Sequence, residues 1–199
     1  MGEGAVIIFA AAGVILLACA LIAFAYSRRG AGASDSAGKA GEYYAAGVIA
    51  GVLRRSDRHF TNVRLSVERR RTEIDNIVIN PHGVFIIEVK NYAGTLEGAA
   101  GEFEWVETKE ARGIAEIKPV KNPIMQAKRQ AEILESYFRL CGETAAIGYY
   151  AILLRGNSPV KSKRILKSVP EVDSALHPPG TRLSAAKVNR LCECIEKLL

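Results

Sequence analysis

"TEIDNIVINPHGVFIIEVKNYAG", residues 72–94, is the most informative stretch of the sequence. It contains two runs rich in Ile and Val around a Pro-His-Gly turn, a pattern typical of a β-hairpin. Three charged residues, Asp75, Glu88 and Lys90, interrupt these apolar runs. Because strand side chains alternate between the two faces, Glu88 and Lys90 point to the same side of their strand.

These three charges need a reason, because a buried ion pair seldom improves on hydrocarbon in a protein core. Metal-dependent phosphodiester cleavage is a chemistry that would require these charges in apolar strands. Two carboxylates can hold Mg²⁺, which prefers oxygen ligands, and a lysine can orient the attacking water and offset charge developing on the phosphate. The pattern therefore predicts a metal site built on Asp75, Glu88 and Lys90.

The turn between the two strands determines whether Asp75 and Glu88 can share a cation. A two-residue loop pairs Asn80 with Gly83 and Asp75 with Glu88, and a four-residue loop also keeps Asp75 on the site's face. A three-residue loop points Asp75 away. We therefore expect an even-length loop, or a compensating bulge, with the two carboxylates within about 6 Å of each other.

The rest of the chain has a mixed α/β pattern. Asn122-Pro123 is a typical helix start, and Ser184 is suited to cap a final helix. The structure of residues 112–121 stays open at this stage. The periodicity predicts helices at 41–55, 122–140 and 184–199, strands at 59–67, 72–80, 84–91 and 145–154, and a small hairpin insertion at 95–107.

A membrane span is expected at the N-terminus. Residues 5–26 carry no charge over a run that as a helix measures roughly 33 Å, about the thickness of the hydrocarbon core. Arg28 and Arg29 follow the run while only Glu3 precedes it, which favours a single-pass protein of the inner cell membrane with a cytoplasmic C-terminal domain. The alternative is a cleaved signal peptide, since "AFA" at 23–25 resembles a cleavage site, but the basic n-region is missing.

The charge of the chain favours a polyanionic partner. The 199 residues carry a net charge of +6, and Glu3 is the only charge before residue 27, so the remainder carries +7. Nucleic-acid phosphate and the anionic inner leaflet both suit this charge. For any one basic cluster a solvated face is the simpler interpretation. The clusters are Arg54-Arg55, Arg69-Arg70-Arg71, Lys118 with Lys121, Lys128-Arg129, and Lys161 with Lys163-Arg164 and Lys167.

Other kinds of site have little support in the sequence. The cysteines and histidines are scattered without metal-ligand spacing, so we expect neither a zinc site nor a nucleophilic triad. The "GK" at 38–39 lacks the neighbouring residues of a phosphate-binding loop, because Ala33 and Ala40 replace the required Gly and Ser or Thr.

Three blocks, "GEYYAAGVIAGVL", "TEIDNIVINPHGVFIIEVKNYAG" and "KNPIMQAKRQ", occur in an order that resembles the NERD (nuclease-related) domain. That family is placed in the PD-(D/E)xK, restriction-endonuclease-like superfamily. The resemblance covers about Gly41 to Leu154 and implies an α-β-β-β-α-β core. Ile74 stands where the superfamily's name has Pro, at a position that varies there, and the sequence after Leu154 has no match.

The resemblance also implies residue roles. Asp75 and Glu88 would be metal ligands for Mg²⁺ or Mn²⁺, and Lys90 the catalytic lysine. Glu42 would be a further metal-binding acid on the first helix, and Gln126 the glutamine of the third block. Both also have structural explanations, since Glu42 suits a helix N-terminus and Gln126 can support its own helix start.

The sequence thus predicts four parts: an anchor at 1–29, a flexible tether at 30–40, a NERD nuclease-like domain at 41–154, and a basic segment with a C-terminal helix packing on the domain at 155–199. We expect a membrane-anchored, metal-dependent nuclease acting on nucleic acid, with DNA favoured over RNA. The alternative is a non-catalytic module that binds nucleic acid or serves as a membrane-associated scaffold. A plain anionic-lipid binder would use the basic clusters but would not need Asp75, Glu88 or Lys90.

Overall fold

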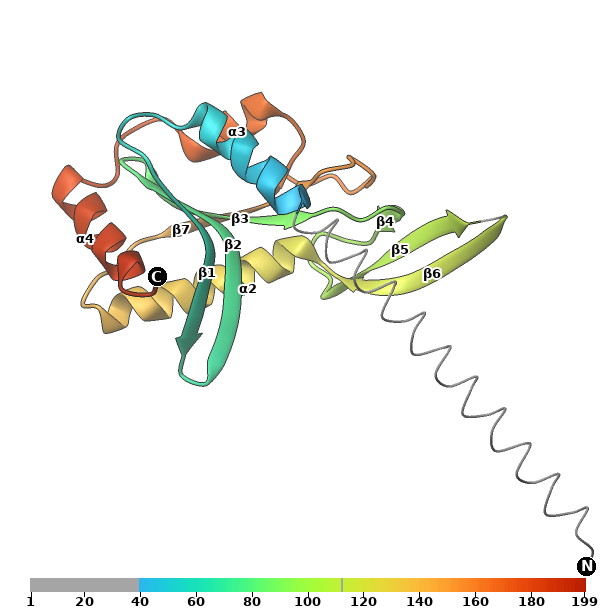
Figure 1. The fold of residues 1–199 in the computed structure, drawn as a ribbon, viewed down its shortest axis with the longest axis horizontal. Helices are drawn as coiled ribbons and strands as arrows, with labels where there is room; N and C mark the ends of the chain where they lie inside the picture. Colours follow the sequence, from blue (N-terminus) through green and yellow to red (C-terminus); the bar gives the residue numbers. More distant parts are fainter. Residues whose placement is uncertain (1–39, 112) are drawn as a thin grey trace, which may run out of the picture. The chain divides into compact units, whose positions relative to one another are not determined.

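The computed structural model describes residues 40–111 and 113–199, with a five-stranded sheet at the centre (Figure 1). A helix over residues 40–52 comes first. The elements that follow are β1 (Arg58–Val67), β2 (Arg70–Asn80), β3 (Gly83–Lys90), β4 (Thr95–Glu97), β5 (Glu104–Ala111), β6 (Ile114–Lys121), α2 (Pro123–Leu140), β7 (Ile147–Leu153), β8 (Ile165–Leu166), α3 (Val169–Leu176) and α4 (Ala185–Glu196).

The central sheet has the strand order β1-β2-β3-β7-β8. β1, β2 and β3 pair antiparallel, whereas β7 runs parallel to β3 and β8 runs parallel to β7. A parallel pair needs a crossover, and α2 lies within the segment that connects β3 to β7. The core thus has the expected α-β-β-β-α-β order, with an insertion before α2.

The β2–β3 hairpin turns through a two-residue loop, Pro81-His82, which pairs Asn80 with Gly83. The Asn80 side chain fixes this turn, because its Oδ1 accepts from the backbone N–H of His82 at 2.8 Å and of Gly83 at 3.1 Å. Its amide also donates to the carbonyl of Leu176 at 2.9 Å. The expected even-length loop is confirmed.

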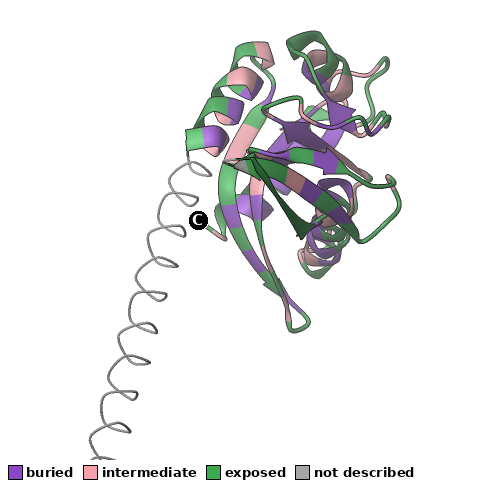
Figure 2. Cartoon of the chain, turned by 90° about the vertical axis from the view of Figure 1, so that its right-hand side faces the viewer, coloured by how far each residue is buried: buried purple, intermediate pink, exposed green. Residues whose placement is uncertain are grey.

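Helices cover both faces of the sheet (Figure 1). One face packs against α2 and α4 in a core that includes Ile77 and Ile86 of the central hairpin. The other face packs against the 40–52 helix and α3, and this core includes Val78 and Ile87. Figure 2 shows the buried residues gathered where sheet and helices meet. Alternate residues of β2 and β3 therefore face opposite layers.

The helix starts follow the sequence signals. Asn122 caps α2, with Pro123 in the first turn and its side-chain oxygen accepting from the N–H of Ile124 at 2.9 Å. Ser184 caps α4, as expected. The apolar side of α4 joins the core beneath β1 and β2 through Val188, Leu191 and Ile195.

The insertion is larger than the expected hairpin. β4, β5 and β6 form a separate three-stranded antiparallel sheet, and residues 114–121, left open by the sequence, form its third strand. Two short elements, β8 and α3, also fall in the segment for which the sequence analysis predicted no strand or helix. Figure 1 shows β5 and β6 projecting away from the central sheet.

The expected anchor at 1–29 lies outside the described residues, as does the expected tether except for Ala40, which begins the first helix. Across residues 40–111 and 113–199, no helix combines the length and apolar character needed to cross a membrane.

Candidate active site

Asp75 and Glu88 are carried by the central hairpin. The β2–β3 register runs from Asn80–Gly83 to Asn76–Ile87, and Asp75 and Glu88 are the next residue on each strand. Glu88 lies on the face covered by α2, because Gln130 of that helix donates to its carboxylate at 2.7 Å. Asp75 is close enough for the charge of Glu88 to act on it.

Regular pairing breaks around Asp75 on both sides. The β2–β3 ladder ends at Asn76, and the Asp75 Oδ2 atom accepts from the backbone N–H of Val89 at 2.8 Å. On the other side, pairing of β1 with β2 skips Asn62, which has a left-handed φ of 54° within the strand. Strain of this kind is held only where the surroundings impose it, and it is frequent at functional sites.

Glu88 is the most buried charge of the site, with 1% of the residue exposed. The Lys90 Nζ atom lies 2.5 Å from Glu88 Oε1. The Gln130 Nε2 atom donates to Glu88 Oε2 at 2.7 Å and to the carbonyl of Glu73 at 3.0 Å. Glu88 is therefore held between its strand neighbour and a side chain from α2.

One buried oxygen of this cluster has no donor among the described residues. It is Gln130 Oε1, whereas Glu88 Oε1 has the Lys90 ammonium at 2.5 Å. Buried polar atoms without partners are rare in folded proteins and often mark a functional position. Free oxygen atoms beside a carboxylate pair are donors that suit Mg²⁺ or Mn²⁺.

The pKa values of Asp75 and Lys90 are both shifted from their ordinary values. Burial raises the pKa of Asp75 to about 7, and the nearby charge of Glu88 adds to this, while the Val89 N–H and Lys90 act in the opposite direction. Burial works to lower the pKa of Lys90, but the charge and hydrogen bond of Glu88 outweigh it, so this pKa is raised. Shifted pKa values in an acid and a lysine that lie close together are typical of a functional site.

The other two predicted residues, Glu42 and Gln126, differ in their relation to the site. Glu42 lies near enough for its charge to contribute to the raised pKa of Asp75, as the smallest of the causes. Even so, within the described part of the chain no three His, Cys, Asp or Glu side chains gather closely enough to hold one metal ion. Gln126 is half-buried on α2, whereas the glutamine that reaches Glu88 is Gln130, one turn further on.

Gln130 is the residue that sequence reasoning missed. The available signal was its place among Ala127, Ala131 and Leu134, which are all buried on the α2 face. A polar side chain on such an apolar face requires a buried partner.

The fold and the site together define a mixed α/β domain with an acid–acid–lysine centre on its central hairpin. A family model described as the nuclease-related domain, NERD, matches residues 37–155. The chain therefore belongs to the NERD family, and the predicted resemblance is confirmed. No curated protein and no solved structure shows significant similarity to the chain.

Proposed function

We propose that this NERD domain is a metal-dependent nuclease with a restriction-endonuclease-like core. The observation that carries the proposal is the cluster of Asp75, Glu88 and Lys90 at the end of the central hairpin, where Lys90 lies 2.5 Å from Glu88 and the charges of both act on Asp75. The α-β-β-β-α-β order of elements and the membership of a nuclease-related family support it.

Asp75 and Glu88 are the residues that would hold Mg²⁺ or Mn²⁺, with Glu42 as the predicted third acid and water completing the shell. Mg²⁺ commonly binds through one or two carboxylates and keeps several waters, so two acids suffice. When bound, the ion would act as a Lewis acid toward a phosphate oxygen and lower the pKa of a bound water. The buried Gln130 Oε1, which has no donor among the described residues, supports this fit.

The chain's own side chains have separate roles in this proposal. Lys90, kept protonated by Glu88, places a positive charge where negative charge develops on the phosphate. Gln130 positions the Glu88 carboxylate through its 2.7 Å hydrogen bond, and the Val89 N–H positions the Asp75 carboxylate. Such supporting hydrogen bonds orient ligands and tune their basicity.

The proposal is tested by incubating the full-length chain with single- and double-stranded DNA and RNA in Mg²⁺, Mn²⁺ or EDTA. Asp75→Asn and Glu88→Gln keep the side-chain shape and should each reduce cleavage at least about 10²-fold, the scale for losing a group that stabilises transition-state charge. Glu116→Gln, at an exposed position on β6, is the matched control and should cleave normally. Full cleavage by Glu88→Gln would refute the assignment.

One observation favours a second candidate, a non-catalytic module that binds nucleic acid. Lys90 already neutralises Glu88, and the raised pKa of Asp75 favours its uncharged form, so the site is balanced without a cation. In this case the wild-type chain binds nucleic acid but cleaves none with either metal. A bound oligonucleotide that stays intact in both Mg²⁺ and Mn²⁺ would establish this candidate over the nuclease.

Membrane anchoring through residues 5–26 is a further proposal, supported by the charge-free run and by Arg28 and Arg29 after it. A reporter active only in the cytoplasm, fused after Leu199, should be active. The mature protein should still begin at or near Met1. Processing after Ala25 would instead identify a signal peptide.

A further inference from the structure

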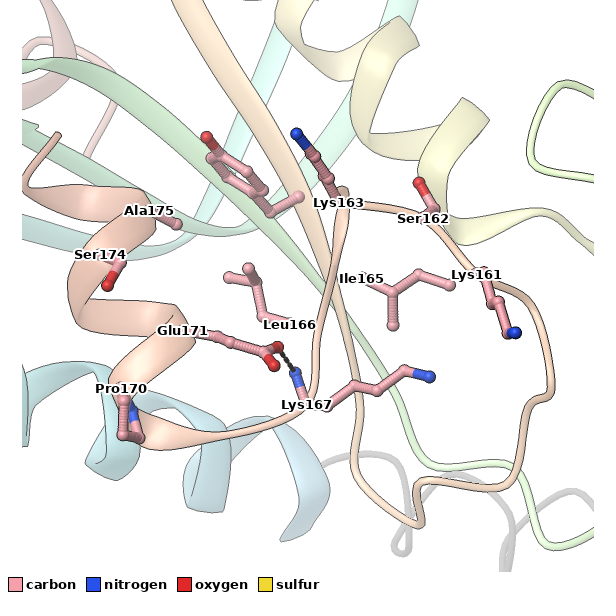
Figure 3. Close-up of a pocket in the computed structure, with 11 residues that line it drawn as sticks. Lys161, Ser162, Lys163, Ile165, Leu166, Lys167, Pro170, Glu171, Ser174 and Ala175 are labelled. Carbon is pink, nitrogen blue, oxygen red and sulfur yellow. Dashed lines mark hydrogen bonds between the residues drawn. The ribbon is translucent and has the colours of Figure 1, made fainter.

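A large cavity lies at the β8 edge of the central sheet. Its volume is about 810 Å³, it opens to solvent, and it is bordered by β7, β8, α3 and the loop that precedes β8 (Figure 3). The residues that line it are Tyr150, Lys161, Ser162, Lys163, Ile165, Leu166, Lys167, Pro170, Glu171, Ser174 and Ala175.

The lining is strongly basic. Lys161, Lys163 and Lys167 are all exposed, and none forms an ion pair with a carboxylate in the described part of the chain. The acid of the lining, Glu171, is engaged with the backbone, because its Oε2 accepts from the N–H of Lys167 at 2.7 Å. Figure 3 shows the Lys161 and Lys167 side chains extending to the same side of Ile165.

The sheet register places the β8 edge two strands from Glu88, and the α3 wall of the pocket lies on the opposite face of the sheet, so a strand bound at both places passes around this edge. Glu88 pairs with Ala151, and Ala151 pairs with Ile165, so the three residues form one row across β3, β7 and β8. Neighbouring strands lie about 4.8 Å apart, which puts Ile165 roughly 10 Å from Glu88. A strand of B-form DNA rises about 3.4 Å per nucleotide along the helix axis, so this separation corresponds to about three base steps of a duplex.

We propose that this cavity binds backbone phosphates of a nucleic-acid strand whose scissile bond lies at Asp75 and Glu88. This inference rests on the proposed function and assigns the substrate a second point of attachment. Unpaired ammonium groups attract phosphate oxygens without reading sequence, and the hydroxyls of Ser162 and Ser174 are further donors. Such contacts fix the position of the strand while the chemistry occurs elsewhere.

The test measures how the affinity of the full-length chain for a fluorescent single-stranded oligonucleotide depends on salt. Each lost phosphate contact lowers the slope of log K against log salt by about 0.7, so Lys161→Gln/Lys167→Gln should lower it by about 1.4 and weaken binding. Lys161→Arg/Lys167→Arg keeps both charges and should retain the slope. Lys109→Gln/Lys197→Gln removes two exposed lysines on β5 and after α4, and should also retain it.

An unchanged slope in the Lys161→Gln/Lys167→Gln variant overturns the phosphate site, even if the chain cleaves nucleic acid. A reduced slope supports the site even if the wild-type chain shows no cleavage, an outcome that rejects the nuclease alone. Vesicles containing phosphatidylserine serve as a second probe. Lysine-dependent binding to these vesicles, with no binding to DNA or RNA, overturns the inference in favour of a lipid headgroup.

Discussion

The Lys90 ammonium lies 2.5 Å from the Glu88 carboxylate, whose residue is 1% exposed, and this pair is both part of the core and the centre of the candidate site. Lys90→Met should therefore have two separable effects. Removing one partner of a buried pair leaves the other charge uncompensated, which costs about 3–5 kcal/mol in the free energy of unfolding. Cleavage should fall at least about 10²-fold, because the positive charge near the phosphate is lost.

The double variant Glu88→Gln/Lys90→Met separates these effects. Since neither charge remains, urea unfolding should show recovery of most of the stability lost in Lys90→Met. Cleavage should stay at the low level of the single variants. Recovery of both stability and cleavage would mean that the pair has only a structural role.

Gln130 is expected to matter because its Nε2 atom bridges Glu88 and the carbonyl of Glu73. Gln130→Leu removes both hydrogen bonds and should lower the free energy of unfolding by about 1–3 kcal/mol. Loss of a group that orients a metal ligand typically costs about 10–100-fold in metal affinity or activity. The activation curve for Mn²⁺ should therefore shift to higher concentration.

The control for Gln130 is Glu132→Gln, at an exposed position of the same helix, which should leave both the stability and the Mn²⁺ curve unchanged. Gln126→Leu shows whether the glutamine predicted from the sequence contributes as well. A Gln130→Leu variant with the wild-type Mn²⁺ curve would restrict Gln130 to packing.

The central hairpin and α2 could be predicted from the sequence because local signals agree there. Apolar runs flank a short turn, and Asn122-Pro123 is both a cap and a first turn. β6 could not be predicted, because its Ile114 and Ile117 are 73% and 68% exposed, so no buried face produces an alternating pattern. β8 and α3 are short, and their position depends on pairing with β7 and packing on the sheet.

The candidate site was predictable to a similar degree. Asp75, Glu88 and Lys90 interrupt apolar strands, which is a local signal, and the turn length then sets the register. The choice between Gln126 and Gln130 depends on which turn of α2 lies over Glu88. That relationship is tertiary, since 42 residues separate Gln130 from Glu88.

Asn62 should be intolerant of side chains that disfavour left-handed backbone. Its φ of 54° costs most residues about 1–2 kcal/mol, while glycine adopts it freely and asparagine more readily than most. Asn62→Val should therefore lower the free energy of unfolding by about that amount, and Asn62→Gly should stay close to wild type. Equal urea midpoints for the Val and Gly variants would contradict a left-handed conformation at this position.

Glu107 anchors the inserted sheet to the end of the central hairpin. It is 2% exposed, and its Oε1 accepts from the backbone N–H of Gly94 at 2.9 Å while its Oε2 lies 2.9 Å from Lys118 Nζ. Burial acts to raise the pKa of Glu107, but the Gly94 hydrogen bond and Lys118 outweigh it, so the pKa is lowered from 4.5. The folded state thus favours the ionised carboxylate.

This lowered pKa predicts a dependence of stability on pH. Below pH 4.5 the unfolded chain binds a proton at Glu107 before the folded chain does, so the stabilisation is present above that pH and is lost as the pH falls through the folded pKa. Urea unfolding from pH 6 to pH 3 should show a smaller loss of stability in Glu107→Gln than in wild type. Glu104→Gln, at an exposed position on β5, should keep the wild-type slope, because its carboxylate has no such bonds in the described residues. Equal slopes for Glu107→Gln and wild type would mean that the Gly94 and Lys118 interactions do not favour the ionised carboxylate in the folded protein.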